Sequence, residues 1–191
     1  MIDGALIGQM AGVLSFIAYI WYAVDTIRGR IRPNRATWWI LTLVGVMIAA
    51  SYYAEGARDT MWIAWSYVAG PFMLAVLSLK YGEGTWEGLD KLCFAGAVIS
   101  AAIWSFSFSL ARVVLLINIL MDFLGLLPTI KKSYLRPKSE GKGPWTIETA
   151  AGAINLFAIG TWTFSIAFYP LYLLAINGII TTLLWWPRSK K

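Results

Sequence analysis

Apolar residues occur along this chain in runs of about twenty, and short segments between them carry most of the charge. A helix needs about twenty apolar residues to cross a hydrocarbon core of about 30 Å. Backbone N–H and C=O groups inside lipid must be paired within their own segment, so these runs predict helices. The predicted transmembrane spans are residues 5–25, 37–54, 61–80, 91–108, 112–131, 145–164 and 168–186.

The composition of the chain supports this interpretation. Of its 191 residues, 59% are hydrophobic and only 14% are charged, whereas a soluble domain carries about a quarter charged residues. The alternating segments of about ten residues that build a membrane barrel do not appear. We therefore expect an all-α integral membrane protein. The first run has no basic segment or small-residue cleavage site before it, so we expect a retained helix rather than a signal peptide.

Lys and Arg are distributed unequally between the loops. The first, third and fifth loops and the C-terminal tail hold Arg28, Arg30, Arg32, Arg35, Lys80, Lys91, Lys131, Lys132, Arg136, Lys138, Lys142, Arg188, Lys190 and Lys191. Only Arg58 and Arg112 fall on the other side. Because basic loops stay in the cytoplasm, this bias predicts a multi-pass cell-membrane protein with its N-terminus outside and its C-terminus cytoplasmic. The net charge of +6 then reflects topology and contact with anionic lipid, and no nucleic-acid partner is expected.

Tryptophan is expected at the two membrane interfaces, where its amphipathic ring is favoured. The residues at the predicted ends of spans are Trp38, Trp39, Trp145, Trp185 and Trp186 on the inner side and Trp62 and Trp162 on the outer side. This placement predicts an aromatic belt, and it disfavours a role for these rings in stacking on a ligand.

Several functional classes are excluded by what the sequence lacks. Cys93 is the only cysteine and there is no histidine, so a disulfide scaffold, an imidazole base and a histidine metal site are impossible. Neither an HExxH nor a GxSxG motif is present, and we expect no enzyme, no cofactor and no metal.

The chain contains an internal repeat. One copy reads TIRGRIRP from Thr26 and continues with Trp38, Ile40, Thr42 and Gly45; the other reads TIKKSYLRP from Thr129 and continues with Trp145, Ile147, Thr149 and Gly152. Each copy lies between the first two helices of a three-helix set. The repeat predicts two parallel three-helix bundles, residues 1–82 and 111–191, joined by a linker helix within residues 83–110. Transporters built from parallel repeats hold substrate near the bilayer midplane. A chance similarity between two amphipathic loops is the alternative.

Polar residues lie near the predicted midpoints of the last three spans. Asp122, Asn155 and Asn177 are at these depths, and Asn118 is one turn before Asp122 on the same helix face. A central aspartate costs at least about 2.5–3.5 kcal/mol by insertion scales, so it should face protein or water. Asp122 is a candidate proton carrier or ligand contact, and the asparagines are candidate solute contacts. The structural alternative is that these groups bond to one another or to neighbouring helices.

Other residues of interest have simpler expected roles. In the first half, Ser15 and Tyr19 lie at the corresponding depth. Asp25 and Glu148 lie at predicted cytoplasmic span ends, where interfacial ion pairs are expected. Pro128 either hinges the fifth helix or only shapes its exit to the loop, and the sequence does not separate these two roles.

The segment MDFLGLLPTIKKSYLRP, Met121–Pro137, resembles the second signature of the PQ-loop transporters. That superfamily includes the SWEET sugar carriers and cystinosin-type amino-acid exporters. Asp122, Phe123 and Gly125 are similar to the stretch that carries a proton-coupling aspartate in the cystinosin type. Asn177 with Gly178 resembles a SWEET asparagine that contacts sugar.

The resemblance implies a carrier that moves a small polar solute, such as a sugar or an amino acid, by alternating access. Asn177, Asn155 and Asn118 would bind the solute, Tyr19 or Phe123 would pack on it, and Asp122 would bind a proton. A receptor or sorting scaffold that does not transport, similar to the KDEL receptors, is the alternative. Whether the protein forms a homo-oligomer is left open.

Overall fold

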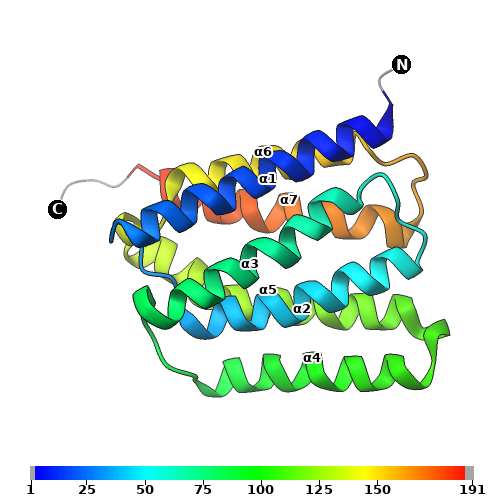
Figure 1. The fold of residues 1–191 in the computed structure, drawn as a ribbon, viewed down its shortest axis with the longest axis horizontal. Helices are drawn as coiled ribbons and strands as arrows, with labels where there is room; N and C mark the ends of the chain where they lie inside the picture. Colours follow the sequence, from blue (N-terminus) through cyan, green and yellow to red (C-terminus); the bar gives the residue numbers. More distant parts are fainter. Residues whose placement is uncertain (1–2, 188–191) are drawn as a thin grey trace.

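The computed structural model describes residues 3–187 as a bundle of helices (Figure 1). The helices are α1 (Gly4–Ile27), α2 (Arg35–Ala54), α3 (Met61–Tyr81), α4 (Gly88–Phe106), α5 (Ala111–Leu135), α6 (Lys142–Leu156) and α7 (Phe164–Trp185), with short 3-10 helices η1 (Phe108–Leu110) and η2 (Pro137–Ser139). The predicted cytoplasmic tail residues Arg188, Lys190 and Lys191 lie outside the described range.

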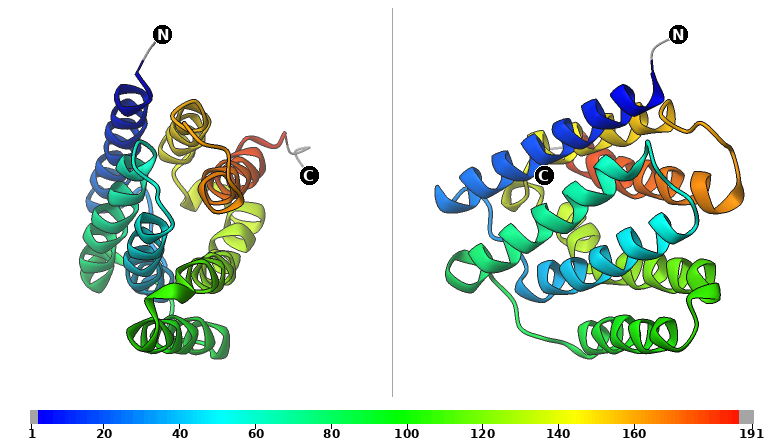
Figure 2. Two further views of the ribbon diagram at one scale, coloured as in Figure 1. Left: turned by 90° about the vertical axis from the view of Figure 1, so that its right-hand side faces the viewer. Right: turned by 45° about the vertical axis from the view of Figure 1, so that its right-hand side comes forward.

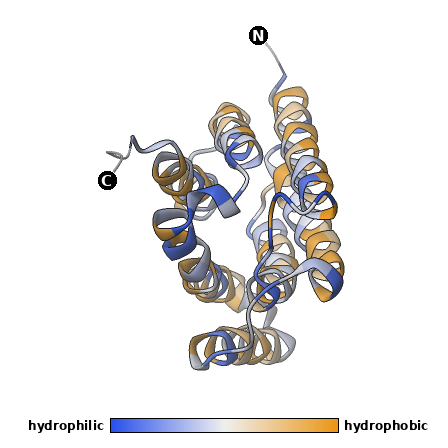
Figure 3. Ribbon diagram, turned by 90° about the vertical axis from the view of Figure 1, so that its left-hand side faces the viewer, coloured by the Kyte–Doolittle hydropathy of each residue, from blue (hydrophilic) through white to orange (hydrophobic). Residues whose placement is uncertain are grey.

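Six of these helices, all except α6, are long and apolar enough to cross a membrane. Their surfaces expose large apolar side chains, such as Met10, Val13 and Ile17 of α1. Hydrophilic residues gather mainly toward the helix ends and loops (Figure 3). Such a surface is unfavourable in water and suits lipid contact. The protein is therefore an all-helical, multi-pass membrane protein.

The predicted sixth span, residues 145–164, is wrong at its end. Helix α6 has 15 residues and ends at Leu156. The apolar residues after it belong to a loop, where Phe157 is 78% exposed. The hydroxyl of Thr163 accepts a hydrogen bond from the Ile166 backbone N–H (3.4 Å) and so starts α7 four residues before the predicted span.

The helices pack as two groups with α4 at one side (Figure 2). Helix α3 packs against both α1 and α2, and α7 packs against both α5 and α6. The groups meet where α1 packs on α6 and α2 packs on α5, while α4 contacts α2 and α5.

Small residues bring α1 against the start of α3. Gly4, Gly8 and Gly12 recur at intervals of four, the spacing that lets helix backbones approach closely in membranes. A Cβ atom at Gly8 would lie 1.8 Å from the backbone oxygen of Asp59, and one at Gly12 would lie 2.6 Å from the backbone carbonyl carbon of Trp62. This contact sets the relative level of α1 and α3.

The two sequence repeats have similar local structure. The hydroxyls of Thr42 and Thr149 each donate to the carbonyl oxygen of the tryptophan four residues earlier, at 2.7 and 2.9 Å. Gly45 faces α3, where an added Cβ would lie 2.6 Å from a backbone oxygen, and Gly152 faces α7, where it would lie 3.4 Å from a Cα. Each copy thus packs its glycine on the third helix of its own group.

Candidate functional site

A buried carboxylate lies where α1, α3 and α6 meet. Glu148 of α6 is 4% exposed, and both of its carboxylate oxygens lie 3.0 Å from the hydroxyl of Ser15, near the middle of α1. The same hydroxyl lies 2.6 Å from that of Ser66 on α3. These contacts join the two helix groups through polar atoms in the protein interior.

The expected interfacial ion pair of Glu148 is therefore wrong. Within residues 3–187, no Lys or Arg forms a salt bridge with this carboxylate. The error follows from the sixth span: since α6 begins at Lys142 and ends at Leu156, its middle lies near Glu148, and Asn155 is its second-last residue. Asp25, by contrast, forms the predicted type of pair, with Arg30 at 3.1 Å.

A second polar contact lies beside the first. The amide nitrogen of Asn177 donates to the hydroxyl of Tyr67 at 2.6 Å, and Tyr67 follows Ser66 on α3. The ring of Tyr19 packs edge-on against that of Tyr67, with 5.7 Å between centroids. Gly70 makes room for this arrangement, because a Cβ there would lie 2.2 Å from the Tyr19 ring.

Asp122 supplies a third polar contact. Its carboxylate is buried and accepts a hydrogen bond from the hydroxyl of Tyr172 on α7. Tyr67 is linked to these contacts because it follows Ser66 on α3 and bonds to Asn177 of α7. We define the interior cluster as Ser15, Ser66, Tyr67, Asp122, Glu148, Tyr172 and Asn177, with Tyr19 packed against it.

The remaining predicted site residues lie elsewhere. Asn118 donates to the Ser100 hydroxyl of α4 at 2.8 Å and so bonds to the helix outside the two groups. Phe123 is 37% exposed on the outer surface. Asn155 is fully buried, and neither of its side-chain polar atoms has a hydrogen-bond partner among the described residues. Pro128 lies within α5 and lines a cleft near its end.

The space next to Glu148 is small. A cavity of about 20 Å³, enough for about one water molecule, is lined by Ala18, Tyr19, Tyr22, Trp38, Pro144, Trp145 and Glu148. Trp38 and Trp145 are buried, so their rings contact protein rather than the lipid that an aromatic belt would contact. The Trp38 ring packs edge-on against the rings of Tyr19 and Tyr22 of α1. The Trp145 indole N–H bonds to Glu140, and α6 packs on α1.

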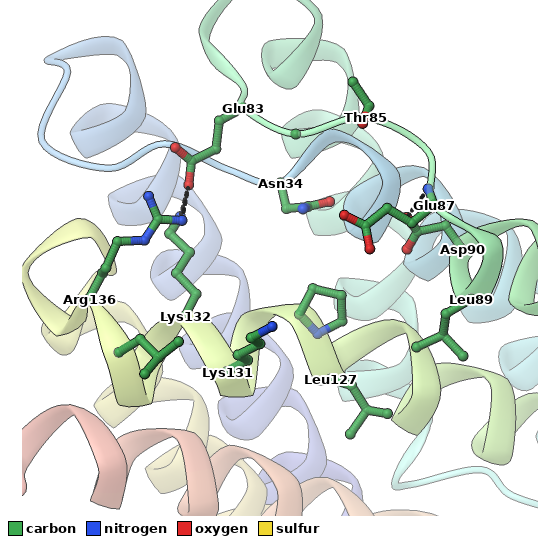
Figure 4. A pocket seen from close by; sticks show the side chains of 13 residues that line it. Asn34, Glu83, Thr85, Glu87, Leu89, Asp90, Leu127, Lys131, Lys132 and Arg136 are labelled. Carbon is green, nitrogen blue, oxygen red and sulfur yellow. Dashed lines mark hydrogen bonds and ion pairs between the residues drawn. The ribbon is translucent and has the colours of Figure 1, made fainter.

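Charged groups close the end of the bundle where the basic loops lie, which we call the basic end. The ammonium group of Lys132 lies 3.0 Å from Glu140 and 3.3 Å from Glu83. The Tyr22 hydroxyl donates to both oxygens of Glu140 at 3.1 Å, and the Trp145 indole donates to one of them at 3.0 Å. A cleft of about 390 Å³ opens beside this network, with Lys132 and the more exposed Arg136 reaching toward Glu83 (Figure 4).

The opposite end is also closed by polar contacts. Glu55, just after α2, forms an ion pair with Arg112 of α5 at 3.1 Å and accepts a hydrogen bond from Ser165 of α7. Partial burial alone would raise the pKa of Glu55, but the bonds from Ser165 and Arg112 outweigh it and hold the pKa below its ordinary value. The Tyr52 hydroxyl donates to the Ile166 carbonyl oxygen at 2.8 Å. Together these bonds link the two helix groups.

Comparison with known proteins adds nothing to this geometry. No family model, curated protein or solved structure matches the chain. In the part of the chain that the structure describes, no three acidic or cysteine side chains cluster so as to hold a metal ion.

Proposed function

We propose that this protein is a membrane carrier that moves a small polar solute by alternating access. The observation that carries the proposal is the interior cluster, which is buried between two helix groups and closed at both ends by polar contacts. Polar groups inside a membrane are costly and usually mark a solute or ion pathway. Ion pairs and hydroxyl bonds at the ends can be exchanged for water when an end opens, so that hydration offsets part of the cost of their separation.

The two groups, α1–α3 and α5–α7, are interpreted as parallel three-helix bundles with α4 as the linker. The sequence repeat, the equivalent packing of Gly45 and Gly152 and the position of the third helix between the other two support this 3+1+3 arrangement. The resemblance to PQ-loop transporters supports an N-terminus outside and a cytoplasmic basic end. In such a carrier the bundles rock about a central site.

Each part of the cluster has a role in this mechanism. Asn177 and Tyr67 hydrogen-bond the solute, and the unpaired amide of Asn155 offers further polar contacts on the path toward the opposite end. Asp122 carries the proton if transport is proton-coupled. Coupling requires that protonation of Asp122 alter the relative stability of the two open states, and its bond to Tyr172 joins two helices of the second group.

Solute flux into proteoliposomes tests this function. Purified protein is assayed with radiolabelled sugars, amino acids, amines and nucleosides, with and without a pH gradient. We expect saturable flux of at least one solute and its loss in Asn177→Ala. Asp122→Asn should remove dependence on the gradient, whereas Asp25→Asn, which removes a carboxylate paired at a helix end, should retain it.

The same assay separates the alternatives. A solute that stabilises the protein against heat but shows no flux would favour a receptor or scaffold. Absence of saturable flux for every solute, with folded protein in the liposomes, would overturn the proposal.

A further inference from the structure

The cavity beside Glu148 brings together one tryptophan from each sequence repeat. Trp38 of α2 and Trp145 of α6 occupy equivalent repeat positions, and both line the same space with Tyr19 and Tyr22 of α1. The wall of this cavity is almost entirely apolar except for the carboxylate. A set of aromatic rings around one acidic group is thus built from both helix groups.

The carboxylate has no cation of its own. Its protein partner is the hydroxyl of Ser15, and Lys and Arg residues of the described range pair with other groups or lie near helix ends. An ionised carboxylate that is buried without a countercharge is strongly unfavourable. Binding of a cation would supply that countercharge.

The aromatic side chains suit an organic cation. The Tyr22 hydroxyl and the Trp145 indole N–H are both bonded to Glu140 at the basic end, so these side chains present mainly carbon to the cavity. Aromatic rings attract cations within about 6 Å of their centroids, tryptophan most strongly. A carboxylate with aromatic rings around it is therefore complementary to an ammonium group.

We propose that the transported solute is a small amine whose ammonium group binds between Glu148 and the rings of Trp38 and Trp145. This inference rests on the proposed carrier function and names its substrate class. The space of about 20 Å³, enough for about one water molecule, matches one ammonium head. A neutral sugar has no charged group to pair with the Glu148 carboxylate.

Binding of ethanolamine to the purified full-length protein in detergent tests the proposal. Isothermal titration compares ethanolamine with ethylene glycol, a neutral molecule of nearly the same size and shape, and choline tests a larger cationic head. We expect ethanolamine to bind at least about tenfold more tightly than the glycol, because only the amine interacts with the carboxylate and the ring faces. Sodium and potassium chloride are titrated as inorganic cations.

Variants assign the interaction to the site. Glu148→Gln should weaken ethanolamine binding by at least about tenfold, and Trp38→Leu or Trp145→Leu by about three- to tenfold. Glu148→Asp should recover part of the affinity, and Asp25→Asn should bind as the wild type does. Each variant is first compared with the wild type by circular dichroism and thermal unfolding.

Three results would overturn the amine assignment. They are equal binding of ethanolamine and glycol, unchanged binding in folded Glu148→Gln, and displacement of ethanolamine by sodium or potassium at equal concentration. Binding in detergent does not require transport, so the two proposals fail separately. Amine binding without flux would reject the carrier function and keep the amine site. Flux of a neutral solute that ethanolamine does not affect would keep the carrier function and reject the amine site.

Discussion

Replacing Lys132 by methionine should destabilise the protein through the network at the basic end. The substitution keeps a long unbranched side chain but removes the ammonium group that lies 3.0 Å from Glu140 and 3.3 Å from Glu83. Glu140 has a side chain only 2% exposed, so it would keep its negative charge in the interior with only the Tyr22 and Trp145 donors.

The structure sets the size of this effect. Removing one partner of a fully buried ion pair costs about 3–5 kcal/mol. The Glu83 side chain is 27% exposed beside an open cleft, so solvent screens part of the interaction. We therefore expect the free energy of unfolding to fall by about 2–3 kcal/mol. Arg136→Met is the matched control: the Arg136 side chain is 64% exposed and its guanidinium lies 3.4 Å from Glu83, so its loss should cost less than about 1 kcal/mol.

Equilibrium unfolding in mixed micelles, followed by circular dichroism, measures these free energies. The double variant Lys132→Met/Glu140→Gln should be more stable than the sum of the single changes predicts, by about 1–2 kcal/mol, because it removes the uncompensated charge. Strict additivity of the two changes, or an equal loss in Arg136→Met, would refute the argument.

Two further predictions concern helix packing and pH. Gly8→Ala should lower the unfolding temperature and separate α1 from α3, because the added Cβ would lie 1.8 Å from the Asp59 backbone oxygen. Gly88→Ala, which has open space around it, should leave the unfolding temperature unchanged. Thermal melts of the two variants test this difference. Glu55 should stabilise the protein at neutral pH and lose this effect as pH falls through its lowered pKa, because the folded state holds the ionised form more strongly than the unfolded state. The difference in unfolding temperature between wild type and Glu55→Gln should therefore be larger at about pH 7 than at about pH 3; a difference that does not shrink in acid would contradict it.

Helix existence could be predicted from the sequence because long apolar runs have one stable form in lipid. The repeat also identified Gly45 and Gly152 as equivalent positions, and the structure adds that each packs on the third helix of its own group. The end of α6 could not be found this way, since Phe157 and Ile159 are as apolar as residues inside a span. Because α6 ends about two turns earlier than predicted, Glu148 lies near its middle instead of at an expected interface.

The candidate site was predicted in part. Asp122, Asn177 and Tyr19 lie in or against the interior cluster, whereas Asn118 bonds to α4 and Phe123 is partly exposed, because the sequence does not show which neighbouring helix each part of α5 meets. Glu148 was the missed residue. Glu148 lies one turn after Trp145 and two turns before Asn155, so it shares a helix face with both. This spacing could have predicted that Glu148 faces the protein interior.

Access to Ser66 from the two sides of the membrane tests the carrier most directly. Cys93, the only cysteine, lies buried in α4, so Cys93→Ser provides a background in which Ser66→Cys is the single thiol, of nearly unchanged size. An impermeant thiol reagent is applied to either side of oriented proteoliposomes. Alternating access predicts reaction from both sides, with Lys132→Met raising the rate from the basic end and lowering it from the other. Reaction from one side only, or from neither side in folded protein, would contradict the account.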